Sequence, residues 1–178
     1  MFLGLRSILE REGKLALVRG AASEPVRALL DRPPLASEWV DGALMHGVLV
    51  AIASAEGLDG VQSISRRAVV ESVAPVLRSY AGPILRLFGG SPHTIFSRLG
   101  EVMKLTNRGV EGGYRGIDDT AAFVSFCHPE AAPMHEAMFA LWRGSIEATL
   151  DFCDVRGTVG EPVVNRAKNG AEFEVRWG

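Results

Sequence analysis

The hydrophobic pattern of this chain changes its period once, near residue 108, and that change constrains the fold more than any other feature. Before it, apolar residues recur every three or four positions, which is typical of helices that bury one face. After it, segments alternate apolar and polar residues with a period of two, as half-buried strands do. We therefore predict a single domain over 1–178, with a helical subdomain over 1–107 and an antiparallel sheet plus a helix over 108–178.

The second part has a definite order of elements. The expected elements are strands over 109–117 and 120–128, a helix over 133–153, and strands over 158–166 and 171–177. Asp118-Asp119 is the expected turn of the first hairpin, and Asn169-Gly170 supplies the left-handed conformations of a tight turn in the second. This order predicts an α+β fold, in which a helical N-terminal half is followed by a four-stranded antiparallel sheet (β-β-α-β-β) packed on the long helix.

Capping residues divide the helical part. Ser37 is the expected cap of a long, apolar and central helix that ends at Gly57. Pro75 and Pro83 are expected to break or kink the helical region that follows. Ser91-Pro92 is a start signal for a helix reaching about residue 105, because serine caps a helix and proline suits its first position.

Charge and apolar content restrict the partners and the compartment. The chain has 19 Lys+Arg and 21 Asp+Glu, a net charge of −2, so it offers no overall field that would recruit nucleic acid or an anionic membrane. The longest apolar stretch, 42–55, is shorter than the roughly 20 residues of a spanning helix. Arg6 and Glu10 interrupt what would be the apolar core of a signal peptide. We expect a cytoplasmic protein without nucleic-acid or membrane partners.

Histidines and cysteines are the residues that could carry a cofactor or metal. His46, in the most apolar helix, is either a haem or metal ligand or a core histidine hydrogen-bonded to a carbonyl. Cys127, His128 and His135 have the side chains of a zinc or haem site, although their spacing also fits a polar strand-to-helix corner. His93 opens the helix behind Ser91-Pro92.

Catalytic motifs give no sign of an enzyme. There is no Gly-x-Ser-x-Gly elbow, and the glycine-rich segment 109–116 lacks the spacing of a dinucleotide or phosphate loop. A glycine-weakened strand accounts for that segment better. Enzymatic activity is left uncertain by the sequence, with a non-enzymatic role preferred.

Four short motifs carry a resemblance to known proteins. They are Glu38-Trp39-Val40-Asp41-Gly42, Ser91-Pro92-His93, Trp142-Arg143-Gly144-Ser145-Ile146-Glu147 and Phe173-Glu174-Val175-Arg176-Trp177. With the element order of the second half, they resemble a family of small myxobacterial proteins of unassigned function. That family is distantly similar to the haem-nitric-oxide/oxygen-binding (H-NOX) and vinyl-reductase-like ligand-binding superfamily.

The resemblance implies a cavity and, in its sharpest form, a haem. By element order His93 is the nearest match to the axial histidine of the haem-binding members. Those members also hold the haem propionates with a Tyr-x-Ser-x-Arg signature. The corresponding stretch here, Phe123-Val-Ser-Phe-Cys-His128, has neither the tyrosine nor the arginine. Two unpaired buried propionates would be costly, so no cofactor is the expectation, with haem as the possible exception.

These observations lead to one principal functional prediction and two alternatives. The principal one is a non-enzymatic cytoplasmic domain that senses a small apolar ligand or binds a protein, with a homodimer as one option. Its ligand pocket would be lined by Trp39, Leu44, His46, Met138 and Trp142, which are also residues that an ordinary core would use. The first alternative is a haem- or metal-binding gas or redox sensor that uses His93, or the corner of Cys127, His128 and His135. The second is a small enzyme without a recognisable motif.

Overall fold

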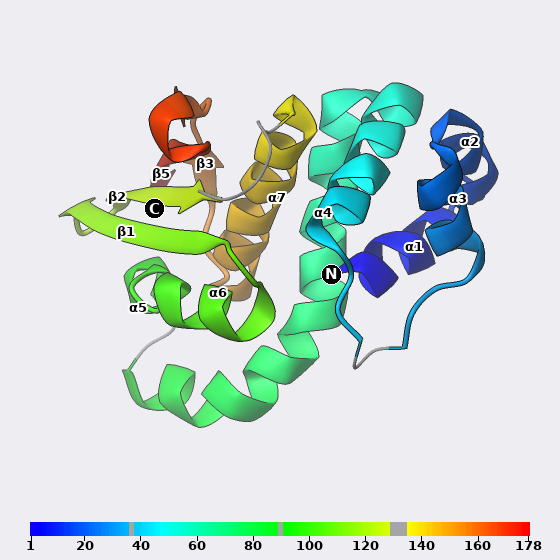
Figure 1. Cartoon of the computed structure of the whole chain (residues 1–178). Helices are drawn as coiled ribbons and strands as arrows, with labels where there is room; N and C mark the ends of the chain where they lie inside the picture. Colours follow the sequence, from blue (N-terminus) through cyan, green and yellow to red (C-terminus); the bar gives the residue numbers. More distant parts are fainter. Residues whose placement is uncertain (36–37, 89–90, 129–134) are drawn as a thin grey trace. The chain divides into compact units, whose positions relative to one another are not determined.

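The structure, a computed structural model, describes residues 1–35, 38–88, 91–128 and 135–178, with the backbone alone over 72–88 and 105–106. In chain order the elements are α1 (Phe2–Arg11), α2 (Leu15–Ala21), α3 (Glu24–Asp31), α4 (Gly42–Phe88), α5 (Pro92–Phe96), α6 (Leu99–Thr106), β1 (Glu111–Asp118), β2 (Ala121–Cys127), α7 (Glu136–Phe152), β3 (Gly157–Val159), β4 (Val163–Asn165), a 3-10 turn (Arg166–Lys168) and β5 (Gly170–Trp177) (Figure 1). The predicted α+β class is confirmed.

The contacts within the chain define two compact units. The first comprises Met1–Val73 and His135–Ser145, and the second comprises Ala74–Met134 and Ile146–Gly178. The residues of α4 and α7 are divided between the two units, and the expected subdomain boundary at residue 107 stays a prediction.

The core of the first unit is made by helices that each bury one apolar face. Its fully buried side chains include Leu5, Ile8, Leu9, Val18, Leu30, Leu49, Ile52 and Ile64. On α1 the buried positions recur every three or four residues, as the hydrophobic period predicts. Burial of side chains of this size stabilises the unit by about 1.5–3 kcal/mol each, before the loss of chain entropy is counted.

Helix α4 begins later than expected and is divided once. Its first backbone N–H groups, of Ala43 and Leu44, donate to the Asp41 carboxylate, so Asp41 is the cap. The expected cap, Ser37, lies outside the described residues. Gly57 has φ 74° and ψ 177°, a conformation open to glycine, and separates two helices as predicted. The backbone stays helical to Phe88, so the expected breaks at the two prolines do not occur.

One segment of α4 passes a length-and-composition test for a membrane span. That segment is Gly42–Glu71. However, the break at Gly57 leaves an apolar helix before it that is shorter than the roughly 20 residues needed, and the helix after it carries Arg66 and Arg67. A continuous apolar helix of spanning length is therefore not present in this segment.

Helix α7 approaches α4 closely at one glycine. A Cβ atom at Gly144 would collide with the carbonyl oxygen of Gln62 and lie 3.0 Å from the amide nitrogen of Arg66. Both obstacles are backbone atoms, which cannot rotate aside. The Trp142-Arg143-Gly144-Ser145 motif therefore has a packing role at its glycine.

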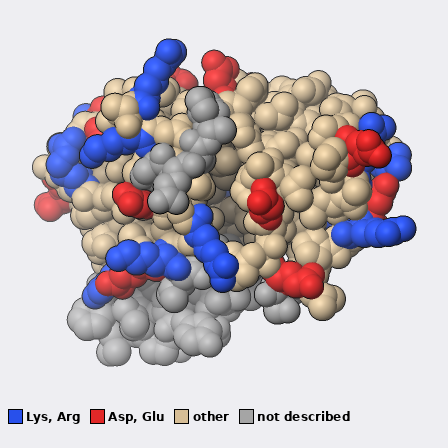
Figure 2. Space-filling model, viewed as in Figure 1, with Lys and Arg blue, Asp and Glu red and all other residues tan. Residues whose placement is uncertain are grey.

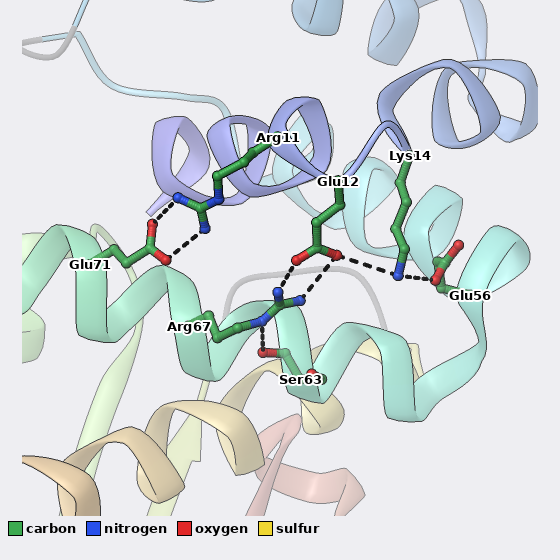
Figure 3. A network of polar contacts seen from close by, with 7 residues as sticks. All are labelled: Arg11, Glu12, Lys14, Glu56, Ser63, Arg67 and Glu71. Atoms are coloured by element: carbon green, nitrogen blue, oxygen red, sulfur yellow. Dashed lines mark hydrogen bonds and ion pairs between the residues drawn. The ribbon is translucent and has the colours of Figure 1, made fainter.

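A network of ion pairs joins the N-terminal segment to α4, as Figure 3 shows. Arg11 binds Glu71 through two hydrogen bonds of 3.0 and 2.7 Å, and these bonds hold the pKa of Glu71 below its ordinary value. Arg67 pairs with Glu12, and the Lys14 ammonium lies 2.6 Å from the Glu56 carboxylate. Most of these groups are at least partly exposed, so we expect the network to orient α1 more than to stabilise the unit.

The second unit is built on an antiparallel sheet. Its strands follow the order β1-β2-β5-β3, and β4 also pairs with β5. Because β2 occupies one side of β5, strands β3 and β4 share the other side, with β3 beside residues 175–177 and β4 beside residues 170–172. The predicted four-stranded sheet is thus present as five strands in four positions. The expected strand 158–166 is interrupted at Gly160–Pro162, where Pro162 has no N–H to donate.

The connection into β5 differs from the expected tight turn. The 3-10 turn Arg166–Lys168 precedes Asn169, which adopts the left-handed conformation at φ 47°. Gly170 already belongs to β5, opposite Cys127, and a side chain there would collide with the Phe126 carbonyl oxygen. The asparagine therefore serves the turn, whereas the glycine permits close strand packing.

The two faces of this sheet differ in cover. Ala122, Val124 and Phe126 point to the buried face together with Phe173 and Val175 of β5. Helices α5 and α6 lie along the sheet in Figure 1, and α6 packs on β1, where Leu99 and Met103 fill the space that Gly112 leaves. The other face carries charged residues and is only partly covered.

Candidate functional site

His93 lies at the start of α5 with both ring nitrogens engaged. Its Nδ1 atom forms a hydrogen bond with the Tyr114 hydroxyl of β1, and its Nε2 atom lies 2.7 Å from the backbone carbonyl oxygen of Asp118. The Asp118 carboxylate is occupied separately, because it accepts from the Thr120 amide and hydroxyl, and these bonds lower its pKa. The sequence expectation of a helix behind Ser91-Pro92 is confirmed, although it ends at Phe96 and α6 follows as a second helix.

Aromatic side chains enclose the same histidine. The Trp177 ring meets the His93 ring edge-on with centroids 4.7 Å apart, and Trp177 also contacts Phe96 at 6.3 Å. Gly116 leaves space beside the pair, since a Cβ there would lie 3.1 Å from the Tyr114 hydroxyl and 3.8 Å from the imidazole. His93, Tyr114 and Trp177 therefore form one packed cluster on the covered face of the sheet.

His46 and His135 meet in the first unit. The His46 Nε2 atom accepts from the backbone N–H of His135 at 3.2 Å, and His135 Nδ1 accepts from the N–H of Ala137 at the start of α7. The two rings are 6.2 Å apart. Partial burial, followed by repulsion from His135, lowers the pKa of His46. A neutral His46 thus helps to hold the first turn of α7, whose N–H groups otherwise lack helical partners.

Cys127 and His128 lie at the end of β2. The Cys127 thiol contacts the Glu111 carboxylate at 3.6 Å, and burial together with Glu111 raises the pKa of this thiol. The His128 backbone exchanges two hydrogen bonds with Asn169. Across the parts of the chain that the structure describes, no three His, Cys, Asp or Glu side chains are grouped to hold a metal ion. The metal site of Cys127, His128 and His135 therefore gains no support and stays a prediction.

The predicted pocket residues belong to the first unit and differ in burial. Trp142 is buried and contacts Phe139 with ring centroids 5.8 Å apart, while Met138, Leu44 and His46 are half-buried. Trp39 is 52% exposed, in the segment before α4. A shallow hollow of about 350 Å³ is lined by other residues, namely Arg156, Gly157, Thr158, Arg176, Trp177 and Gly178.

Acidic and basic side chains lie among one another on the face drawn in Figure 2. Figure 2 shows Lys and Arg interspersed with Asp and Glu over the described surface of that face, without a broad area of one sign. This distribution agrees with the nearly balanced composition.

Comparison with known proteins identifies the fold. No protein-family profile matches the sequence, and no curated protein matches it. Among solved structures, a Cs H-NOX mutant containing 4-cyano-L-phenylalanine superposes with a TM-score of 0.71 at 12% identity, over 98% of this chain and 92% of that chain. A mutant of T. tengcongensis H-NOX gives 0.68 at 12% identity, over 97% and 93%. An oxygen-binding H-NOX domain related to soluble guanylate cyclases gives 0.63 at 11% identity, over 98% and 91%.

These similarities define the chain as a protein with the H-NOX fold. The identities of 11–12% establish the architecture and leave the ligand open. The resemblance inferred from element order is therefore confirmed at the level of the fold.

The residues present do not form the haem-holding set that the resemblance implies. Tyr114 is paired with Val124, so His93 lies on the face of the sheet to which Val124 points. Phe123, Ser125 and Cys127, the stretch expected to meet the propionates, point to the opposite face. The expected axial ligand and the expected propionate stretch are thus on different faces, and both nitrogens of His93 already have partners.

Sequence reasoning found His93 but missed its partners. Ser91-Pro92-His93 and the terminal strand ending at Trp177 were both recognised as motifs, and the structure brings them into contact. The sequence places Tyr114 only within a glycine-weakened strand. Whether Tyr114 meets His93 depends on the register of β1 against β2, and the alternation of residues alone does not determine that register.

Proposed function

We propose that this chain is a sensory domain of H-NOX fold that takes up a small ligand without turning it over. The observation that carries the proposal is the match of nearly the whole chain to domains of that fold, one of which is described as oxygen-binding. The lack of a nucleophile or phosphate-loop motif agrees with a non-enzymatic role.

We further propose that the ligand is apolar and reaches Trp39, Leu44 and Met138, in a cytoplasmic protein. The half-buried state of Leu44 and Met138 supports this version, since a packed core would cover them fully. An exposed indole such as Trp39 is suited to closing over an apolar group.

A haem-binding gas sensor is the second candidate, and the names of the structural neighbours favour it. One of them refers to haem distortion in the H-NOX family. Against it stand the hydrogen bonds of His93 and the missing tyrosine and arginine of the strand Phe123–Cys127. We therefore assign no residue of this chain to haem.

Haemin titration followed by absorption spectroscopy separates the two candidates. The apolar-ligand proposal expects no saturable Soret band, but a saturable rise in Tm with decanoate or indole as the probe, because a ligand bound only by the native state stabilises it. A Soret band that saturates at one haemin per chain would favour the haem-binding gas sensor instead. If neither haemin nor the apolar probes bind saturably, the sensory proposal fails.

A matched pair of variants locates the site. Trp39→Ala is expected to weaken binding of the probe roughly tenfold, the effect of losing about 1.4 kcal/mol of apolar contact. Leu17→Ala is the control, since Leu17 is similarly exposed at 55% but lies on α2. Equal affinity of the two variants would remove Trp39 from the site.

A further inference from the structure

We infer that His93 is a tether that holds α5 against the sheet as a neutral imidazole with its proton on Nε2. The inference goes beyond the proposed function, since it concerns how α5 is held whichever small ligand the domain takes. It rests on the two hydrogen bonds and the aromatic contacts of the His93 cluster.

The chemistry of the partners determines which nitrogen carries the proton. The carbonyl oxygen of Asp118 can only accept, so Nε2 must donate to it. In the neutral ring Nδ1 then has the lone pair, and the Tyr114 hydroxyl donates to it. Both nitrogens are satisfied by protein groups in this one tautomer.

In that arrangement both ring nitrogens are already bonded to protein groups, so neither is available to a metal. A ligating histidine offers the lone pair of one nitrogen to the metal and donates the N–H of the other to an acceptor. Ligation through Nε2 would remove the hydrogen bond to Asp118, and ligation through Nδ1 would displace the Tyr114 hydroxyl. His93 therefore has no nitrogen to offer while α5 stays in place.

Helix α5 depends on such contacts because it is short. It spans five residues, and helices of that length are not stable in isolation. The Ser91 side chain accepts from the Thr94 amide at 3.3 Å, and Pro92 at the first position leaves one fewer N–H to satisfy. These features start the helix but do not place it. Its inward-facing side chains, His93 and the 2% exposed Phe96, make the contacts with Tyr114, Asp118 and Trp177.

The tether connects α5 to both an edge strand and a central strand. Tyr114 and Asp118 belong to β1, and Trp177 ends β5. Movement of α5 away from the sheet must break two hydrogen bonds to β1 and separate His93 from Trp177.

The tautomer can be observed directly in the ligand-free protein. Long-range ¹H–¹⁵N correlation spectra of ¹⁵N-histidine-labelled protein, in mildly alkaline buffer, should show His93 with Nε2 protonated and Nδ1 unprotonated. A change in the His93 Nδ1 chemical shift in Tyr114→Phe would show that the Tyr114 hydroxyl is the partner of this nitrogen. A His93 ring with the proton on Nδ1, or in rapid exchange between both forms, would overturn the inference.

Variants test the tether by a second route. Tyr114→Phe is expected to lower Tm by roughly 2–4 °C, the effect of about one lost hydrogen bond in a domain of this size. His93→Ala should lower it further, while His93→Gln should recover part of the loss because an amide can donate to Asp118 and accept from Tyr114. Arg98→Gln is the control, since the Arg98 side chain is 68% exposed and pairs across a helix turn with Glu101. A Tm unchanged in both Tyr114→Phe and His93→Ala would contradict the tether.

Haemin titration of the same variants keeps this inference separate from the proposed function. If wild type and His93→Gln give the same spectra, His93 is not an iron ligand, whatever the domain binds. A histidine-ligated spectrum in the wild type that is lost in His93→Gln but kept in His46→Gln would overturn the inference. Failure of the apolar probes to bind would leave it standing, because the tautomer and the Tm series do not depend on a ligand.

Discussion

In the first unit, helices are joined by packed apolar faces and by charge pairs between segments far apart in the sequence. In the second unit, by contrast, strands are joined by backbone hydrogen bonds and by packed aromatic side chains. Arg67 and Glu12 exemplify the first kind of contact, and Phe126 with Phe173, at 6.5 Å between ring centroids, exemplify the second. Charge pairs respond to salt and pH, while close packing responds to side-chain volume. The two units should therefore differ in which changes they tolerate.

The largest expected effect is the removal of a buried ring from the second unit. Phe173 is fully buried on β5, and Phe173→Ala should lower the free energy of unfolding by about 3–5 kcal/mol because it leaves a cavity. Chemical denaturation measures this change. Val163→Ala is the control, since Val163 is 69% exposed on β4. A loss below about 1 kcal/mol for Phe173→Ala would show that packing does not dominate in this unit.

A smaller but substantial effect is expected from the helix contact in the first unit. Gly144→Ala should cost about 1–3 kcal/mol, because the new methyl group meets the Gln62 backbone and forces α7 and α4 apart. Gly20→Ala on α2 is its control, since no atom lies within 4 Å of that position. There we expect a gain of about 0.5–1 kcal/mol from the better helix propensity of alanine. The same glycine-to-alanine change should thus lower the free energy of unfolding at position 144 and raise it at position 20.

The pH dependence of the first unit should reveal His46. Because burial and His135 lower the pKa of His46 in the folded state, the unfolded chain takes up its proton first as the pH falls. The contribution of neutral His46 to the free energy of unfolding is therefore present above about pH 6.5, the ordinary pKa of histidine, and is lost as the pH falls below that value. His46→Gln retains an acceptor for the His135 amide but does not titrate. An unfolding free energy with the same slope below pH 6.5 in both proteins would exclude this role for His46.

The smallest effect should come from the ion pairs of Figure 3. Arg67→Gln is expected to reduce the free energy of unfolding by less than about 1 kcal/mol, and less still in high salt, since partly exposed pairs are screened. A double-mutant cycle with Glu12→Gln isolates the pair from other contacts of Arg67. A coupling energy above about 2 kcal/mol that persists in high salt would show the network to be a main support of the unit.

Much of the fold follows from local patterns in the sequence, and the exceptions have identifiable causes. The strands β1 and β2 were predicted from alternation and a turn at Asp118-Asp119, and the break at Gly57 from the conformational freedom of glycine. By contrast, helix α4 continues past Pro75 to Phe88, because a proline disturbs a helix without always ending it. The division of the edge strand at Pro162 depends on which residues of β5 pair with β3 and which pair with β4. That pairing is determined by the whole sheet and cannot be predicted from the local sequence.

The site was predicted residue by residue but not as an arrangement. His93 was singled out from its motif, yet its role depends on Tyr114, Asp118 and Trp177, which come from distant segments. Their meeting requires the register in which Tyr114 opposes Val124 and Val124 opposes Phe173, and a shift by one residue would turn each side chain to the other face. No single motif contains that information.

The split of one sheet edge between β3 and β4 has a consequence for the behaviour of the protein at high concentration. An unbroken edge strand presents a row of free N–H and C=O groups on which a strand of another molecule can grow. Here the two edge strands are three residues each, and the Gly160–Pro162 interruption between them disrupts the repeat of donors. Although Val163 and Val164 are exposed on β4, this edge is too short and too irregular to nucleate intermolecular sheets. A single proline and its neighbours thus protect this edge of the sheet, whereas the opposite edge is the continuous eight-residue strand β1.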